Sequence, residues 1–310
     1  MHGMNKFWLK IAFFVLPVLI GFEFLFRMGF PPIMTNSIFF DHKMGQLQKH
    51  PVGDIKLLAV GSSMTLYSLN SPIITQNIHA PYYNFASWNL QISETRVCLS
   101  QLVKDYHPHY VLICSAPGDF TQANNPTYLN YTHTPRFIRN HIPEWFYFAN
   151  FHSLHQIFLR KYSASYVLDM DPWGGGMGIF EMPRRNNGRD DPDDLLWQKL
   201  LDFKSPYFAT QYKELDSLCA SLQEAKVKLI FAQVPLKPAL ITTDSLSRLV
   251  ADHVQRCRTI VESHGGAYLN YCDTAAFRDS LFRGSIHFTA EGSKVFTKRL
   301  VADLKTLIPE

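Results

Sequence analysis

The sequence predicts an α/β fold in which a parallel sheet is enclosed by two layers of helices. Short apolar segments bounded by turn residues alternate with longer segments of helical periodicity, which is typical of strand–helix–strand units. The chain has 310 residues, of which 46% are hydrophobic and 18% charged, so it is long enough to bury a large core. Its composition is neither repetitive nor typical of a disordered chain.

Five apolar segments are predicted to form the strands, namely residues 55–60, 82–86, 110–115, 227–234 and 267–271. Helices are predicted at residues 91–106, 211–225, 245–264 and 290–307, the last with Thr289 as its N-cap. Ligands bind at the carboxyl ends of the strands in such sheets, so functional residues are expected directly after the strands.

Residues 1–30 are predicted to be a membrane anchor. Residues 11–22 form an unbroken apolar run, and a helix over residues 7–27 would be about 30 Å long, enough to cross a bilayer. Its charged residues are Lys10, Glu23 and Arg27. Lys10 and Arg27 are expected to reach the headgroups, whereas Glu23 argues against the span. An amphipathic or buried helix is the alternative.

The orientation of this anchor follows from the residues around it. Lys6 and Lys10 precede the apolar run and favour an N-terminus inside the cytoplasm, which would place the rest of the chain outside it. No small-x-small cleavage site follows, so a single-pass, uncleaved anchor is expected rather than a removed signal peptide.

Charge and cysteine usage exclude several classes of function. The formal net charge is +4 without dense Lys/Arg runs, so nucleic acid is not an expected partner. The five cysteines show no C-x-x-C spacing, which indicates neither a zinc site nor a thioredoxin-like motif. No metal and no cofactor are expected.

Residues 31–310 are predicted to form one domain interrupted by an irregular insertion at residues 120–206. This segment is rich in aromatic residues, Pro, Asn and Asp, and it contains the aromatic run 145–148 and a glycine-rich loop at 171–178. Such a segment can stack on sugars, bind an acyl chain, form a lid or build a small satellite core. The candidates for substrate contact are Trp173, Gly174 and Trp88.

The candidate chemistry begins at Gly61-Ser62-Ser63, where the first predicted strand ends. A Gly-x-Ser turn between a strand and a helix exposes the serine hydroxyl, as a nucleophile requires. Alone, this tripeptide is an ordinary turn. The inference depends on its pairing with His287, which precedes the last helix and is the candidate general base.

Four ordered segments carry a family resemblance, namely residues 61–63, 84–87, 116–119 and 285–292. Together they resemble the blocks of the SGNH/GDSL hydrolase superfamily, over about residues 55–305 outside the insertion. With an N-terminal anchor, the chain is most similar to the membrane-anchored branch that includes the D-alanyl-lipoteichoic acid transfer protein and the alginate O-acetyltransferases. The resemblance implies a three-layer α/β/α, flavodoxin-like fold.

Carried over by position, the resemblance makes Ser63 the nucleophile and His287 the base. Backbone N–H groups of Ser63, Ala86 and Ser87 would form the oxyanion hole. The sequence departs from the family pattern at two positions: Gly118 stands where the family has an oxyanion-binding Asn, and Gly284 where it has an Asp that orients the histidine. For the oxyanion, Asn89, Gln91 or Asn124 are possible replacements.

Three arrangements can replace the missing orienting acid. Asp279, which we favour, or Asp273 can reach the histidine from a rearranged loop. Asp119 can approach from the end of the third strand. A backbone carbonyl can instead orient the ring in a Ser–His dyad, without an acid.

The sequence therefore predicts a serine-dependent O-acyltransferase or esterase outside the cytoplasm, acting on acyl groups of cell-surface glycans or polymers. Its partners would be an acyl donor, a glycan or polymer acceptor, the membrane through residues 7–27 and, by resemblance, a membrane-bound O-acyltransferase. The rival class is an SGNH-like binding or scaffold protein with an impaired site. A plain lipase or esterase, with water as acceptor, is a third possibility.

Overall fold

The computed structural model describes residues 2–27, 43, 53–88, 90–123, 170–176, 203, 205–272, 276–283 and 286–309. The chain divides into two compact units, residues 1–51 with 126–166 and residues 52–125 with 167–310. The sheet and all described candidate residues belong to the second unit. Most of the predicted insertion, including residues 145–148, lies outside the described residues, so its bounds stay a prediction.

The second unit is built on a five-stranded parallel sheet with the order β2-β1-β3-β4-β5. The strands are β1 (Leu57–Ala59), β2 (Tyr82–Asn84), β3 (Tyr110–Ser115), β4 (Lys228–Gln233) and β5 (Ala267–Asn270). Leu57 pairs with Tyr82 on one side and with Tyr110 on the other. The predicted α/β class is confirmed, and each strand falls within its predicted segment.

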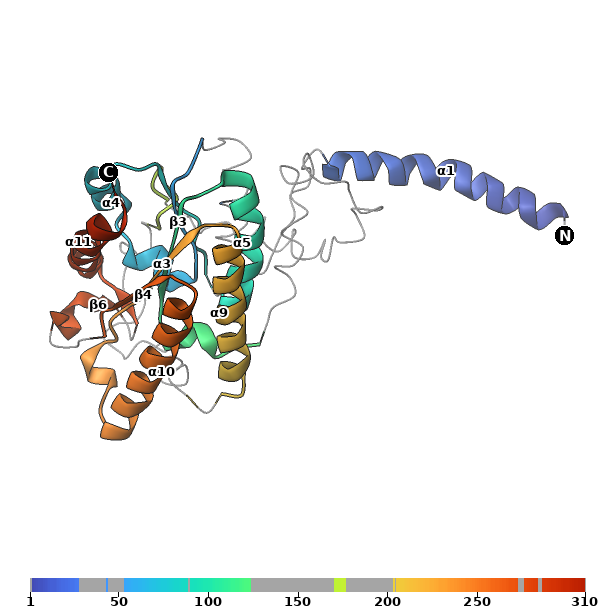
Figure 1. Cartoon of the computed structure of the whole chain (residues 1–310). Helices are drawn as coiled ribbons and strands as arrows, with labels where there is room; N and C mark the ends of the chain where they lie inside the picture. Colours follow the sequence, from blue (N-terminus) through green and yellow to red (C-terminus); the bar gives the residue numbers. More distant parts are fainter. Residues whose placement is uncertain are drawn as a thin grey trace, which may run out of the picture. The chain divides into compact units, whose positions relative to one another are not determined.

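Helices cover both faces of the sheet (Figure 1). One layer holds α3 (Ser63–Ser68), α4 (Ser71–Asn77) and α11 (Ala290–Leu307), and the other holds α5 (Ile92–Tyr106), α9 (Tyr207–Glu224) and α10 (Asp244–Ser263). This is the arrangement that right-handed crossovers give for this strand order. Short 3-10 turns η1 (Pro117–Phe120), η5 (Pro238–Leu240) and η7 (Asp279–Leu281) and a hairpin of β6 (Phe282–Arg283) and β7 (His287–Phe288) complete the described elements.

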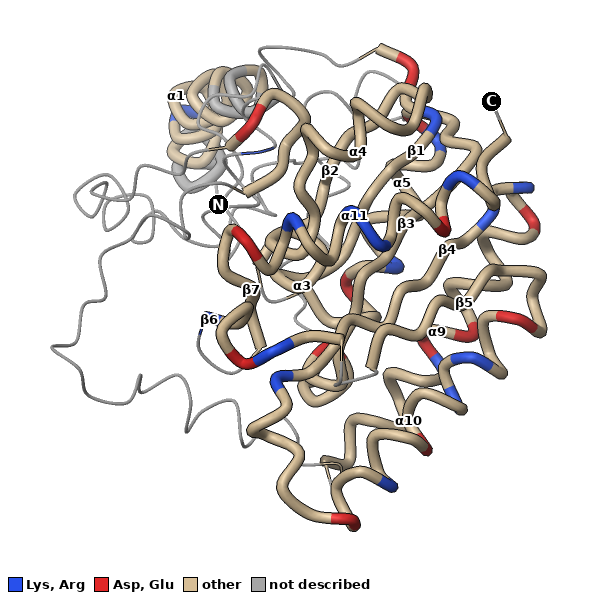
Figure 2. The backbone as a smooth tube through the Cα atoms, turned by 90° about the vertical axis from the view of Figure 1, so that its left-hand side faces the viewer, with Lys and Arg blue, Asp and Glu red and all other residues tan. Residues whose placement is uncertain are grey.

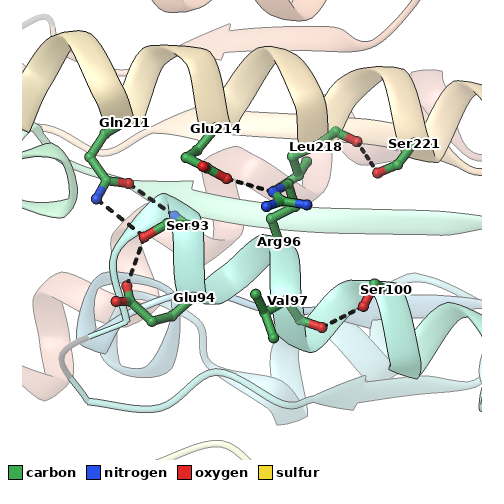
Figure 3. Close-up of polar contacts among 9 residues, drawn as sticks. All are labelled: Ser93, Glu94, Arg96, Val97, Ser100, Gln211, Glu214, Leu218 and Ser221. Carbon is green, nitrogen blue, oxygen red and sulfur yellow. Dashed lines mark hydrogen bonds and ion pairs between the residues drawn. The ribbon is translucent and has the colours of Figure 1, made fainter. Parts of the chain in front are cut away.

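Polar side chains join α5 to α9 (Figure 3). The Ser93 amide donates to Gln211 Oε1 at 2.9 Å, and the Gln211 Nε2 donates back to Ser93 Oγ at 3.2 Å. One turn further on, Arg96 Nε lies 2.6 Å from a Glu214 oxygen. These contacts fix the start of α5, the helix that follows the loop after β2.

Acidic and basic residues are interspersed along the helices of the second unit (Figure 2). This distribution agrees with the small net charge of +4. The core is instead apolar, and its strand residues Leu57, Leu58, Val111 and Leu112 are fully buried. Burial of such side chains is the main stabilising contribution to the sheet.

The first unit contains α1 (His2–Arg27), a single helix with Pro17 inside it. Across the described residues, no helix combines the length and the apolar character that a bilayer crossing requires. The membrane-spanning anchor predicted over residues 7–27 is therefore not supported. The unbroken apolar run in this helix, residues 11–22, is shorter than the about 20 apolar residues of a typical span.

Candidate active site

The turn between β1 and α3 depends on Gly61. Its φ is +146°, a backbone conformation that side chains disfavour, and a Cβ at this position would lie 2.4 Å from Thr65 Oγ1. Ser62 follows as the N-cap of α3, because its Oγ accepts the Met64 amide at 3.0 Å. Ser63 is consequently the first residue of the helix, at the carboxyl end of β1.

Thr65 holds this short helix on the sheet. Its hydroxyl donates to the Cys114 carbonyl at 2.8 Å and accepts the Cys114 amide at 3.0 Å. Both groups are buried, so this hydroxyl satisfies backbone groups of β3 that would otherwise lack a partner on that side. The position of Ser63 is thereby tied to the central strand.

We expect Gly61→Ala to destabilise the protein by about 3 kcal/mol, because the new methyl group adds a clash with Thr65 to the backbone strain. Gly265→Ala is the matched control. Gly265 has a φ of +75° but open space around its missing Cβ, so only the strain, about 1 kcal/mol, is expected there. Denaturant unfolding measures both values, and equal losses would contradict the role of the clash.

His287 reaches Ser63 from the β6–β7 hairpin. Adjacent strand residues point to opposite faces, and Phe288 is buried against the rings of Phe277, Phe282 and Phe296. His287 therefore points away from this aromatic cluster toward α3, which lies beside the hairpin (Figure 2). Its Nε2 is 2.9 Å from Ser63 Oγ, across 224 positions of sequence.

Helix α11 anchors the hairpin relative to α3. Thr289 caps α11 through the Gly292 amide, and its own amide donates to the Leu281 carbonyl at 2.8 Å. Further along, the Ser293 and Thr297 hydroxyls both donate to the carbonyl of Ser68, the last residue of α3. The helix after His287 is thus fastened to the helix that begins with Ser63.

Tyr67 supports the imidazole from the side. Its ring lies edge to face with the His287 ring, with centroids 5.6 Å apart and planes at 89°. The Trp88 indole N–H donates to the Tyr67 hydroxyl. Gly176 packs on the same tyrosine, since a Cβ there would lie 2.7 Å from the Tyr67 ring. Trp88 and residues 170–176 therefore reach the site through Tyr67.

The electrostatic environment keeps His287 neutral. Burial, together with the positive charge of Arg283, lowers the pKa of His287 to about 4. The ordinary imidazole pKa near 6.5, which the sequence alone would predict, does not apply to His287. At neutral pH the ring is ready to accept a proton.

Asp119 accepts hydrogen bonds from the end of β3 and from the turn that precedes Ser63. Its Oδ2 accepts the Ser115 hydroxyl at 2.8 Å and the Ala116 amide at 3.2 Å, and its carboxylate also accepts the Ser62 hydroxyl. Burial raises the pKa of Asp119 to about 6, although these hydrogen bonds oppose the rise. Within the described residues it makes no hydrogen bond with His287, so the structure does not place it as the orienting acid.

Asp279 does not reach the histidine either. It is exposed in η7, and its Oδ1 accepts the Ala239 amide at 3.1 Å. The prediction of Asp279 as the orienting acid fails because the 3-10 turn directs its carboxylate to the loop after β4. Asp273 lies outside the described residues.

The predicted oxyanion donors differ in their availability. The Ala86 amide donates to Asn84 Oδ1 at 3.0 Å, and the Ser87 amide donates to the Gly61 carbonyl at 2.9 Å. Both amides therefore stabilise the loop after β2 instead of pointing into the site. The Ser63 amide, at the start of α3, has no hydrogen-bond acceptor among the described residues.

Gln91 does not replace the family asparagine. Its Nε2 donates to the Gly118 carbonyl at 3.4 Å, and its Oε1 accepts the Gln122 amide at 3.0 Å. The side chain connects the start of α5 to the loop after β3. Asn89 and Asn124 lie outside the described residues.

The predicted substrate contacts at Trp173 and Gly174 belong to a packed turn. Asp171 Oδ1 accepts the Trp173 and Gly175 amides, and the Trp173 carbonyl accepts the Asn84 amide at 2.7 Å. Gly174 is buried, and a Cβ there would lie 2.4 Å from the Asn84 carbonyl. Gly174 is thus placed in close packing against β2, whereas Trp173 and Trp88 are half-buried, and substrate contact by these residues stays a prediction.

Sequence reasoning missed Tyr67 and Arg283. Tyr67 follows Ser63 by four residues, the helical spacing that places two side chains on one face, and this spacing is the signal that points to it. Arg283 has no comparable local signal, because its place opposite His287 depends on the register between the two short strands β6 and β7. No group of three or more metal-binding side chains occurs within the described ranges.

Comparisons with known proteins match the fold weakly. No protein-family model matches the chain, and no curated protein matches it. A solved GDSL-like lipase from Bacteroides thetaiotaomicron is similar at 10% identity, over 87% of this chain and 100% of that chain, with a TM-score of 0.44.

Two further solved structures are similar to the same extent. A catalytic mutant of an acetylxylan esterase from Geobacillus stearothermophilus has 9% identity over 82% of this chain and 95% of that chain, with a TM-score of 0.42. An alpha/beta hydrolase enzyme from the metagenome of Lake Arreo has 11% identity over 83% and 98%, with a TM-score of 0.43.

Proposed function

We propose that the protein is a serine esterase or acyltransferase in which Ser63 is the nucleophile and His287 the general base. The observation that carries this proposal is the 2.9 Å contact between Ser63 Oγ and His287 Nε2. A serine hydroxyl is a weak nucleophile unless a base within hydrogen-bond reach takes its proton. His287 is such a base, and its lowered pKa keeps it unprotonated at neutral pH.

The reaction would proceed in two steps. Ser63 Oγ attacks the ester carbonyl carbon while His287 Nε2 takes the hydroxyl proton, and the imidazolium then donates that proton to the departing alcohol oxygen. In the second step, water or another hydroxyl attacks the acyl-serine, and His287 again takes and returns a proton. The Ser63 amide is the described candidate for stabilising the oxyanion.

The same two steps serve hydrolysis and transfer, which differ only in the acceptor. The resemblance to the membrane-anchored branch, which rests on the N-terminal segment together with the motifs at residues 61–63 and 285–292, favours an acceptor hydroxyl on a cell-surface glycan or polymer. It also favours a membrane-bound O-acyltransferase as donor partner and a position of the domain outside the cytoplasm. A half-buried Trp88 beside Tyr67 offers a surface on which a sugar ring can stack.

A scaffold without catalysis is the second candidate, and specific observations favour it. Gly118 and Gly284 stand at the family's Asn and Asp positions. The Ala86 and Ser87 amides are engaged within the loop after β2. A loss of one oxyanion donor lowers turnover about 10²- to 10³-fold when nothing replaces it.

Labelling with a fluorophosphonate separates these two functions, because the probe reacts with activated serines. We expect stoichiometric labelling of the full-length protein and none of Ser63→Ala. Ser62→Ala, which removes the neighbouring hydroxyl but keeps Ser63, is expected to be labelled still. Mass spectrometry of the labelled peptide identifies the modified serine, and an unlabelled wild-type protein would favour the scaffold.

A further inference from the structure

Tyr67 and Ser63 lie on one face of α3, at the spacing of one helical turn. Helical side chains lean toward the N-terminus, so the Tyr67 ring extends back toward the turn that presents Ser63. Tyr67 is only 1% exposed, one of the largest fully buried side chains of the described residues. Its ring is therefore an interior group beside the nucleophile rather than a surface that a substrate covers.

The imidazole of His287 contacts α3 at two points. Its Nε2 lies 2.9 Å from Ser63 Oγ, and its ring meets the Tyr67 ring with centroids 5.6 Å apart and planes at 89°. A single hydrogen bond leaves an imidazole free to tilt about the line between donor and acceptor. The perpendicular ring restricts this tilt, in the edge-to-face arrangement that aromatic pairs prefer.

The Tyr67 ring is itself held by segments outside α3. The Trp88 indole N–H, from the loop after β2, donates to its hydroxyl. Gly176, from the turn at residues 170–176, lies so close that a Cβ there would be 2.7 Å from Cε1 and 3.1 Å from Cδ1 of the ring. Burial also raises the pKa of Tyr67 above its ordinary value, which keeps the phenol neutral. Tyr67 therefore acts through packing and hydrogen bonding, not as a second base.

We propose that Tyr67 is a positioning residue for the general base, whose ring sets the tilt of the His287 imidazole toward Ser63 and keeps water from it. This inference rests on the proposed function, and it adds a residue that acts through His287. Trp88 and Gly176 take part by holding the Tyr67 ring. Misplacing a reacting group by about 1 Å can lower a rate about 10²-fold, so the loss of this contact is measurable.

Two substitutions at Tyr67 separate the ring from its hydroxyl. Tyr67→Leu removes the ring, and kcat on an activated aryl acetate is expected to fall about tenfold to a hundredfold. KM should change little, since Tyr67 is buried. Tyr67→Phe keeps the ring and is expected to retain most of kcat. Wild-type kcat in a folded Tyr67→Leu protein, or equal losses in both variants, would overturn the inference.

Gly176→Ala tests the same contact without changing Tyr67. The new methyl group would lie 2.7 Å from the Tyr67 ring, so the ring must shift, and kcat is expected to fall about tenfold. Gly53→Ala is the matched control, because Gly53 precedes β1 and a Cβ there meets no atom of the described residues within 4 Å. This pair keeps the test decisive if Tyr67→Leu does not fold. Equal kcat values in the two glycine variants would contradict the inference.

The titration of His287 separates this inference from the proposed chemistry, because it needs no turnover. Proton NMR of the full-length protein follows the imidazole, and His287→Ala assigns its signal. In the wild type the pKa is expected at about 4, where burial and Arg283 place it. In Tyr67→Leu water reaches the ring, so burial is relieved and the pKa should rise toward 6.5. Tyr67→Phe should leave it unchanged.

The charged groups around His287 stay the same in these variants. The elements β6, α3 and α11 pack against β7. Arg283 lies opposite His287 on β6, α3 carries no charged side chain, and α11 carries Glu291 and Lys294 near its start, both exposed. A change in the His287 pKa therefore reports the lost ring.

The two measurements together decide which proposal fails. If no ester is cleaved but the His287 pKa still rises in Tyr67→Leu, the proposed chemistry fails and the positioning contact stands. An equal His287 pKa in the wild type and in folded Tyr67→Leu would overturn the positioning contact, whatever the activity.

Discussion

Ser63→Ala is expected to lower kcat on an activated aryl acetate by about 10⁴-fold or more. The variant removes the hydroxyl oxygen that lies 2.9 Å from His287 Nε2, so no covalent step can follow. What remains is the contribution of binding and of the oxyanion donor. Stopped assays at neutral pH, corrected for the rate of spontaneous hydrolysis, measure the loss.

The control for this variant is the unfolding curve. Ser63 is the first residue of α3, whereas the capping hydroxyl belongs to Ser62, so alanine at position 63 should leave the helix intact. We therefore expect the free energy of unfolding to change by less than about 1 kcal/mol. Retained hydrolysis in a folded Ser63→Ala protein would remove Ser63 from the reaction.

His287→Ala is expected to cause a loss of similar size, about 10⁴-fold or more, because the serine then has no base. The losses should not multiply in the double variant, since both residues act in one step. His264→Ala serves as the control, because that imidazole contacts Asp216 in the opposite helical layer. If the two fold-losses multiply in the double variant, Ser63 and His287 act separately.

The pH profile tests the same assignment independently. The pKa of His287 is lowered to about 4, and the base must be neutral to act. Activity, as kcat/KM, should therefore be level above about pH 5 and fall tenfold per unit as pH drops below about 4. A midpoint near the ordinary value of 6.5 would show that burial and Arg283 do not set this pKa.

Much of the fold was predictable because its signals are local. Residues 110–115 form a short apolar run between turn residues, and they become the central strand β3 without adjustment. The pairing of Ser63 with His287 was predictable because Ser63 directly follows a strand, while His287 lies in a motif just before the last helix, which can return a loop to the same edge of the sheet.

The rest of the site depends on where particular side chains and backbone amides point, and no local sequence pattern determines this. Asp279 is near His287 in sequence, yet a 3-10 turn directs its carboxylate to the Ala239 amide. The Ala86 and Ser87 amides follow β2 as an oxyanion hole requires, yet Asn84 and Gly61 accept them. Which acceptor an amide finds is decided by loop packing between distant segments, and sequence spacing does not record it.

The anchoring of α11 on α3 has a consequence for how the protein is made. The ribosome delivers Ser63 before His287, and all five strands of the sheet precede the hairpin that carries His287. A nascent chain can therefore assemble its sheet while the base is still missing. A newly synthesised chain therefore lacks the proposed base until this hairpin has emerged and docked, even when its sheet is complete.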